Sequence, residues 1–356
     1  MDGRARLPRF TVRIVSRIAR AGLVLCSTAI VARAQTRAAY RDLWRDTAPH
    51  QASMVRVAPN VRLHYLDFGG SGPSIVLLAG LGNTAHAFDD FAPALTDRYH
   101  VVALTRRGFG ESDHPLSGYD TRRLVEDIRV AIDSLHLGRV TLIGHSIAGE
   151  EMTRFAATYP KRVDKLVYLD AAYDRVALDS ALDAIFPVPL DVPEPPTPSA
   201  ADTATAAAYV AFVHRTRGVD IPEADIRTRY RYDGWREDAT LPYQAIESER
   251  PPYASVRAPA LAIYAVTDSV SQLEPWQRSD TAQFAGLAAL VRGSEIAFAQ
   301  SRAEFRSRVA HGSVLEIHGA HHWIFVSNRD QVLAAIRNFL ARADSADEHQ
   351  SMNRSR

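Results

Sequence analysis

The sequence is nearly devoid of cysteine and lysine and has no large net charge of either sign. Cys26 is the single cysteine among 356 residues, which excludes a disulfide framework and a cysteine-based metal site within one chain. Lys161 and Lys165 are the only lysines, and 42 basic residues nearly balance 41 acidic residues, for a net charge of +1. Without an excess of positive charge, the sequence predicts no nucleic-acid partner.

The N-terminal apolar run, AGLVLCSTAIVA, is too short to span a bilayer. It follows an arginine-rich start and precedes Ala32 and Ala34, an order typical of an export signal that is cleaved after Ala34. A basic helix lying on a membrane surface is the alternative. We expect residues 1–34 to be a signal peptide, and the mature chain to be periplasmic or secreted, without a stable membrane span.

From residue 53 onward, short apolar runs alternate with helix-like segments. The runs SMVRV and VRLHYLDFG flank a turn and predict a hairpin. Six further strands are expected at SIVLLAG, YHVVALT, RVTLIG, DKLVYLD, ALAIYA and SVLEIHG. This alternation predicts an α/β fold, with a mainly parallel central sheet covered by helices on both faces.

One long segment interrupts the alternation. Six prolines fall within residues 186–198, and an alanine-rich and an aromatic stretch follow before the next strand. Because the chain must return to the same sheet, a cap or lid over residues 173–257 is favoured over a flexible, proline-rich loop. The remaining boundaries are expected as follows: a lead-in at 35–52, a core domain at 53–172 and 258–341, and a polar tail at 342–356.

Ser146 lies between a strand-like and a helix-like run, in VTLIGHSIAGEEMTRFAATYP. A reversal of about three residues forces a tight backbone, and the small residues Gly144, Ala148 and Gly149 relieve the crowding of such a turn. The turn would place the serine hydroxyl beside a helix N-terminus, which favours developing negative charge. Helix capping is the alternative role of Ser146.

The order of several motifs resembles the α/β-hydrolase superfamily. GHSIA is similar to its nucleophile motif, G-x-S-x-G, with Ala148 at the last small position. VLLAGLGNTAHAF resembles the loop that supplies half of the oxyanion hole, and LTRRGFGESDHP resembles a further turn of the family. The resemblance implies Ser146 as nucleophile and the backbone N–H groups of Leu81 and Ile147 as oxyanion donors.

Thirteen histidines are candidates for the catalytic base. In SVLEIHGAHHWIF, a strand and a glycine turn precede two adjacent histidines. The spacing that the resemblance implies selects His322 over His321, and His318 falls too early in the loop.

Two strand ends offer the carboxylate that would orient the histidine. Asp268 ends the strand after the predicted cap, and Asp170 ends the strand before it. Both satisfy the chain order of serine, acid and histidine, and we prefer Asp268 because it matches the usual position in the family. Asp170 is the alternative acid.

These residues predict a serine hydrolase of carboxylic esters, with a small-molecule ester as substrate and with neither a metal nor an organic cofactor implied. The alternatives are an amide or peptide hydrolase of the iminopeptidase type and a non-catalytic binding protein of the same fold. A serine nucleophile argues against dehalogenase and epoxide hydrolase chemistry, which relies on aspartate in similar folds. The sequence leaves the oligomeric state open.

Two further features have two interpretations each. Glu150 and Glu151 follow the nucleophile closely and belong either to a solvated helix face or to the site. Aromatic residues of the predicted cap line an apolar substrate pocket or form the cap's own core: Tyr209, Phe212, Tyr230, Tyr232 and Trp235.

Overall fold

The computed structural model describes residues 44–354, apart from residues 189, 191, 194, 233–248 and 279–283. The predicted signal peptide, Cys26 and Trp235 lie outside the described residues, as does part of the predicted lead-in. Among the helices that are described, none is both long enough and apolar enough to cross a membrane.

In the described part of the chain, eight strands form one sheet, in the order β1-β2-β4-β3-β5-β6-β7-β8. The pairs β1–β2 and β2–β4 are antiparallel, and all other neighbouring strands are parallel. The strands are β1 (Gln51–Ala58), β2 (Val61–Gly69), β3 (Ser74–Leu78), β4 (His100–Leu104), β5 (Val140–His145), β6 (Val163–Leu169), β7 (Ala260–Val266) and β8 (Gly312–His318). Each corresponds to a strand expected from the sequence, and the predicted fold class is confirmed.

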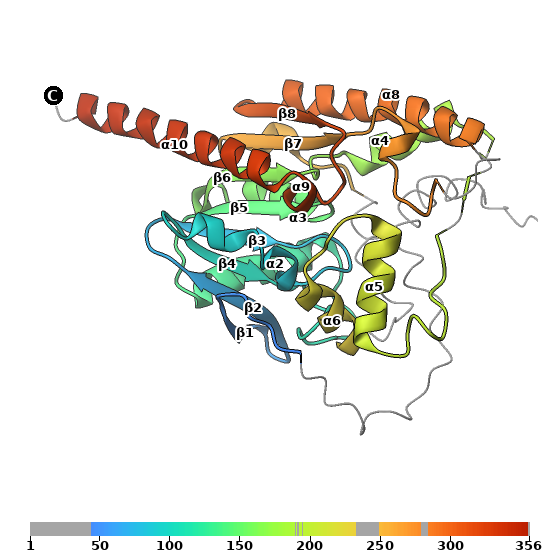
Figure 1. Ribbon diagram of the computed structural model, residues 1–356. Helices are drawn as coiled ribbons and strands as arrows, with labels where there is room; N and C mark the ends of the chain where they lie inside the picture. Colours follow the sequence, from blue (N-terminus) through green and yellow to red (C-terminus); the bar gives the residue numbers. More distant parts are fainter. Residues whose placement is uncertain are drawn as a thin grey trace, which may run out of the picture.

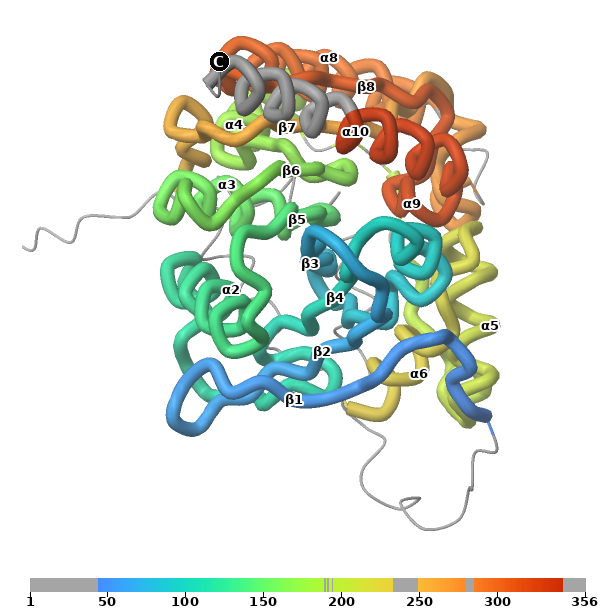
Figure 2. Tube along the Cα trace, turned by 90° about the vertical axis from the view of Figure 1, so that its left-hand side faces the viewer, coloured from blue at the N-terminus to red at the C-terminus, as the bar shows by residue number. Residues whose placement is uncertain are grey.

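Helices cover both faces of the sheet, because successive side chains of a buried strand point to opposite sides. Ile75 and Leu77 of β3 belong to one apolar layer, whereas Val76 and Leu78 belong to the other. In Figure 2 the strands rise from β1 to β8, with α2 and α3 on one side and α9 and α10 on the other. The helices that flank the sheet are η2 (Ala85–Phe88), η3 (Ala92–Leu95), α2 (Thr121–Ser134), α3 (Ala148–Thr158), η4 (Pro160–Arg162), η7 (Val270–Gln272), α8 (Phe284–Arg308), α9 (Ile324–Ser327) and α10 (Arg329–Arg354).

The helix after Ser146 forms as its spacing predicts. Ala148, Met152, Phe155 and Ala156 of α3 are each at most 1% exposed, so one stripe of the helix packs against the sheet. This packing fixes the helix N-terminus directly behind Ser146.

The segment between β6 and β7 contains α4 (Arg175–Ile185), α5 (Ala206–Arg217), α6 (Glu223–Tyr232) and η6 (Tyr253–Ser255). Thr205 caps α5 by accepting a hydrogen bond from the Ala208 N–H, and Gly218 ends the helix with φ 69°. Figure 1 shows α5 and α6 together at one side of the sheet. They occupy the predicted cap, whose domain boundaries stay a prediction.

Candidate active site

Ser146 occupies a strained turn between β5 and α3. Its φ is 55°, a left-handed conformation that a residue with a side chain rarely adopts. The Ser146 N–H donates to Leu169 O of β6 at 3.2 Å, and the Gly149 N–H donates to Ser146 O at 3.0 Å. These bonds anchor the turn to a neighbouring strand and to the first turn of α3.

The small residues around Ser146 are required by close packing. A Cβ on Gly149 would lie 1.9 Å from Ala171 O, and one on Gly144 would lie 2.3 Å from Met152 Sδ. The methyl group of Ala148 would be 3.0 Å from that Gly144 Cβ, so the turn accommodates alanine there only because position 144 is glycine.

The carboxylate of Asp170 holds His322 in place. His322 Nδ1 lies 2.6 Å from Asp170 Oδ2. Asp170 Oδ1 accepts hydrogen bonds from the Tyr173 hydroxyl and from the Ala265 N–H, the latter at 3.1 Å. Both oxygens of this buried carboxylate therefore have defined partners, which fixes the orientation of the imidazole.

The expectation that Asp268 orients His322 is wrong. Asp268 Oδ1 lies 2.9 Å from His318 Nδ1 instead, and both side chains are about half exposed. The strand register explains the difference: Val266 of β7 pairs with His318 of β8, so Asp268 emerges beside the end of β8. Asp170 comes one residue after Leu169, which pairs with His145, so it lies level with Ser146.

His321 has a different environment from its neighbour His322. Its Nδ1 accepts a hydrogen bond from the Trp323 N–H at 3.2 Å, and its Nε2 lies 3.6 Å from Glu274. Burial lowers the pKa of His321 to about 4, so the ring is neutral near pH 7. His318 is exposed and paired with Asp268, which raises its pKa. Of the three candidates, His322 is the one that contacts a buried strand-end carboxylate.

His145 supports the loop that carries His322. Its Nε2 donates to His322 O at 3.0 Å, and the centres of the two rings are 4.6 Å apart. The ring is fully buried, and burial, together with the nearby His322, lowers its pKa well below the ordinary value. His145 is therefore a neutral hydrogen-bond donor. His145 directly precedes Ser146 in the sequence, but the sequence gave no signal for its contact with His322.

Two acidic residues fix the loop that contains Leu81. Asp225 of α6, which is completely buried, accepts from the Asn83 side chain at 2.8 Å and from the Thr84 N–H at 2.7 Å. Glu151 of α3 forms a two-pronged ion pair with Arg106, with both distances 2.7 Å. These contacts connect the loop to the insertion on one side and to α3 on the other.

The Arg106 guanidinium also donates to Ala79 O at 3.0 Å, directly before the loop.

Glu150 and Glu151 are 4% and 2% exposed, so the interpretation as a solvated helix face is wrong for both. Burial raises the pKa of Glu150 to about 8, and one of its carboxyl oxygens has no hydrogen-bond partner among the described residues. Neither Asp225 nor the role of Arg106 was predicted, because each acts across more than 25 positions of sequence.

A pocket of about 370 Å³ opens beside these residues and is lined by Ser146, His322, Leu81 and Ile147. This volume lies within the usual range for small-molecule sites. About half of the further lining residues are apolar: Tyr173, Leu178, Leu182, Tyr209, Val213, Ile221, Leu273, Trp276, Leu290, Val291, Phe298 and Trp323. The others are mainly polar or charged, and they include Arg175, Arg217, Arg229, Glu274 and Glu295. Leu81 and Ile147 line the same pocket as Ser146, and their role as oxyanion donors stays a prediction.

The aromatic residues of the insertion divide between the two interpretations. Tyr209 lines the pocket. Phe212 and Tyr230 pack against the ring of Tyr209, with ring centres 6.2 and 5.5 Å from its centre. Tyr232 is 41% exposed. One aromatic ring thus faces the pocket, and two form an internal cluster behind it.

Comparison with known proteins places this geometry in context. Residues 73–328 match the family model described as alpha/beta hydrolase fold. The chain is 29% identical over 275 residues to the 2-(acetamidomethylene)succinate hydrolase of Mesorhizobium japonicum, which covers 76% of this chain and 89% of that protein. A crystal structure of E-2-(acetamidomethylene)succinate hydrolase has the same fold, with a TM-score of 0.56 and 23% identity over 82% of this chain and 99% of that one.

A shorter match has higher identity. Over 102 residues the chain is 33% identical to an uncharacterized protein of Mycobacterium tuberculosis, a stretch that covers 29% of this chain and 30% of that protein. This match spans less than a third of the relative's length and concerns only part of the domain.

Proposed function

Since residues 73–328 make this chain a member of the alpha/beta hydrolase family, we propose that it is a serine hydrolase that cleaves carboxylic ester bonds through an acyl-enzyme. The observation that supports this most strongly is that Asp170 Oδ2 lies 2.6 Å from His322 Nδ1, beside the pocket that Ser146 lines. A strained serine, a histidine and a buried carboxylate at one pocket are the parts that acyl transfer requires.

In the proposed reaction, Ser146 Oγ attacks the acyl carbonyl carbon while His322 Nε2 accepts the hydroxyl proton. Asp170 holds the opposite nitrogen of the ring and stabilises its charged form. The backbone N–H groups of Leu81 and Ile147 bind the oxyanion. His322 then returns the proton to the departing alcohol, and a water molecule, activated in the same way, releases the acid.

The pocket walls support a substrate with apolar groups of small or medium size. Leu178, Leu182 and Val213 lie on the side of the insertion, and Trp276 and Phe298 follow later in the chain. Burial of apolar substrate surface against these side chains would supply most of the binding free energy.

Amide hydrolysis is the second candidate, and two observations favour it. A relative that matches over most of its length is named for an acetamido substrate that carries carboxylates. In this chain Arg175 lines the pocket, and its buried Nε has no hydrogen-bond partner among the described residues. A guanidinium in this position suits a substrate carboxylate.

A substrate panel separates the two candidates. The purified protein is assayed on p-nitrophenyl esters of increasing acyl length, on amino-acid anilides and on N-acetylated enamines with and without a carboxylate. Ester turnover that is highest for apolar acyl groups and is lost in Ser146→Ala supports the proposal. Preferential turnover of the carboxylated amides, lost in Arg175→Gln, supports the second candidate, and no turnover of any substrate favours a binding protein.

Export forms part of the proposal and rests on the sequence of residues 1–34 alone. The expected mature chain begins at Gln35, after the small residues Ala32 and Ala34. Intact-mass measurement of protein from the periplasmic or secreted fraction tests this, because a chain that retained residues 1–34 would contradict cleavage.

A further inference from the structure

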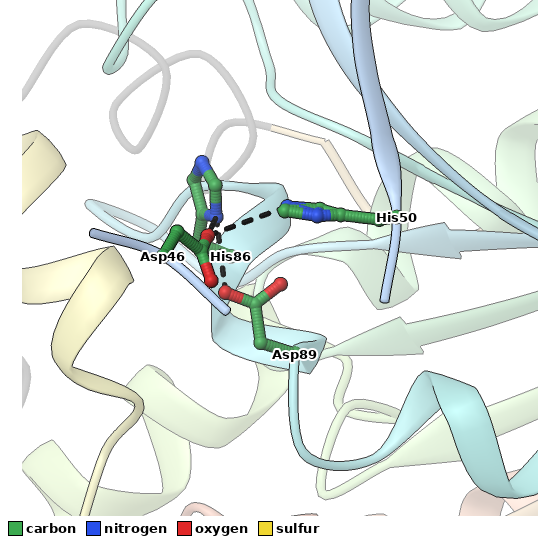
Figure 3. A group of neighbouring side chains, drawn as sticks. All are labelled: Asp46, His50, His86 and Asp89. Carbon is green, nitrogen blue, oxygen red and sulfur yellow. Dashed lines mark hydrogen bonds and ion pairs between the residues drawn. The ribbon is translucent and has the colours of Figure 1, made fainter. Parts of the chain in front are cut away.

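A cluster of two histidines and two aspartates lies on the core, outside the pocket. Asp46 and His50 belong to the segment that precedes β1, whereas His86 and Asp89 belong to η2 and its C-cap. Figure 3 shows the four side chains pointing toward one another from these two segments. Their donor atoms all lie within 4.8 Å of one another.

The distances in the cluster suit a shared central ligand. His86 Nδ1 is 3.0 Å from both Asp46 Oδ2 and Asp89 Oδ2, and His50 Nε2 is 3.3 Å from Asp46 Oδ2. Four nitrogen and oxygen donors placed tetrahedrally about 2.0–2.1 Å from a zinc ion lie about 3.3–3.4 Å apart. Small shifts would therefore convert the cluster into a coordination shell.

The cluster does not satisfy its own hydrogen bonds. The His86 Nδ1 atom has a carboxylate oxygen on each side, at 3.0 Å from both Asp46 and Asp89, so a single hydrogen is shared between two acceptors. Asp89 Oδ1 has no hydrogen-bond partner among the described residues. Neither ring nitrogen of His50 makes a hydrogen bond among the described residues, although Nε2 lies 3.3 Å from Asp46 Oδ2 and the side chain is only 7% exposed. Buried polar atoms without good hydrogen bonds are costly, and a cation at the centre would give Asp46 Oδ2 and His50 Nε2 a ligand bond.

We propose that Asp46, His50, His86 and Asp89 bind one divalent transition-metal cation, with zinc preferred. Two imidazoles with two carboxylates form a mixed nitrogen and oxygen donor set that Zn²⁺ accepts in tetrahedral geometry, whereas Mg²⁺ and Ca²⁺ prefer oxygen donors. The cation would balance two aspartates that are otherwise close together in a buried place.

The surroundings suit a fixed metal site. The ring of His64 stacks on that of His86 at 5.6 Å, and that of Phe68 stacks on His50 at 5.5 Å. Glu111 pairs with His64 at 2.8 Å, and both have donor atoms within 4.8 Å of His86.

The site lies outside the pocket, and its role would be structural. It would fasten the segment that precedes β1 to η2, directly after the loop that carries Leu81 and Asn83. All four donors come from protein, which is typical of a structural rather than a catalytic zinc site. Metal binding is therefore expected to stabilise the fold more than to change the chemistry, and it is independent of the proposed esterase activity.

The zinc content of the purified protein tests the proposed metal site directly. The untagged full-length chain is stripped with a chelator, loaded with ZnCl₂, dialysed and analysed for zinc and protein. We expect about one zinc per chain, and a rise in Tm of roughly 5 °C when free zinc is about 100 times Kd. Tetrahedral visible bands on replacement with Co²⁺ identify the geometry even if a variant fails to fold.

Variants connect the metal to these residues. His50→Gln and Asp89→Asn should each lower zinc affinity at least tenfold and reduce the rise in Tm at the same free zinc to about half or less. His100→Gln is the matched control, because His100 Nε2 contacts Asp67 at 3.0 Å in a His–Asp pair outside the cluster, and it should bind zinc as the wild type does. The proposal is overturned if the wild type retains little zinc, if Co²⁺ gives only octahedral spectra, or if both cluster variants bind zinc normally.

Discussion

Asp170 Oδ2 lies 2.6 Å from His322 Nδ1, and Asp170 follows β6 at the level where Ser146 follows β5. This places the proposed acid and the proposed nucleophile on adjacent strands, with His322 reaching back from the loop after β8. The role of each carboxylate near the sheet edge can be tested separately.

Asp170→Asn is expected to lower kcat by about 10⁴, because an amide holds the imidazole in the wrong tautomer. Asp268→Asn, which removes only the exposed pair with His318, should change kcat less than about threefold. Steady-state ester hydrolysis by both variants, with folding checked by circular dichroism, measures the contrast. A large loss of kcat in Asp268→Asn, together with an active Asp170→Asn, would refute Asp170 as the acid that orients His322.

Tyr173 is expected to be a positioning residue for Asp170. Burial, together with the adjacent Asp170, raises the pKa of Tyr173 well above its ordinary value, so the hydroxyl stays protonated and donates to the carboxylate. Tyr173→Phe should lower the free energy of unfolding by about 1.5–3 kcal/mol and shift the pH profile of kcat through His322. An unchanged pH profile in a destabilised variant would indicate a purely structural hydrogen bond.

The pair of Arg106 and Glu151 is expected to be costly to break. Both side chains are at most 7% exposed, so Glu151→Gln leaves a buried guanidinium without its counter-charge and should cost about 3–5 kcal/mol of unfolding free energy in urea titrations. The double variant Arg106→Met/Glu151→Leu should cost less than Glu151→Gln. Equal losses in both would mean that the charge pairing is unimportant.

Glu150 should make the fold less stable as the pH rises. Burial raises its pKa in the folded state to about 8, above the ordinary 4.5. The native state therefore holds a proton that the unfolded state releases, and stability falls with rising pH between about 4.5 and 8. Glu150→Gln should remove this part of the decline.

Thermal unfolding of the wild type and Glu150→Gln at pH 5 and pH 8 measures the difference. The variant is expected to gain in Tm relative to the wild type on going from pH 5 to pH 8. The control Glu223→Gln, at a partly exposed glutamate that pairs with Arg227, should follow the wild type between these two pH values. Parallel curves for all three proteins would show that Glu150 is not protonated in the folded state.

The sheet was predictable because each strand has a local apolar pattern, and Ser146 because glycine and alanine surround it at fixed spacing. Asp170 and Asp268 could not be distinguished in this way, since both follow apolar strands. Only the register decides between them, by setting His145 against Leu169 and Val266 against His318. Register depends on pairing between distant segments of the chain. The contact of Asp225 with Asn83 also joins distant segments, the insertion and the loop after β3, and could not be predicted for the same reason.

Covalent labelling by a fluorophosphonate tests the central claim, that Ser146 is an activated nucleophile, most directly. Mass spectrometry of the digested protein should find one adduct, on the peptide that contains Ser146. The adduct should be absent in Ser146→Ala, which should also lose a factor on the order of 10³ to 10⁶ in kcat. Ester hydrolysis that persists in Ser146→Ala, or an adduct on another serine alone, would contradict the account.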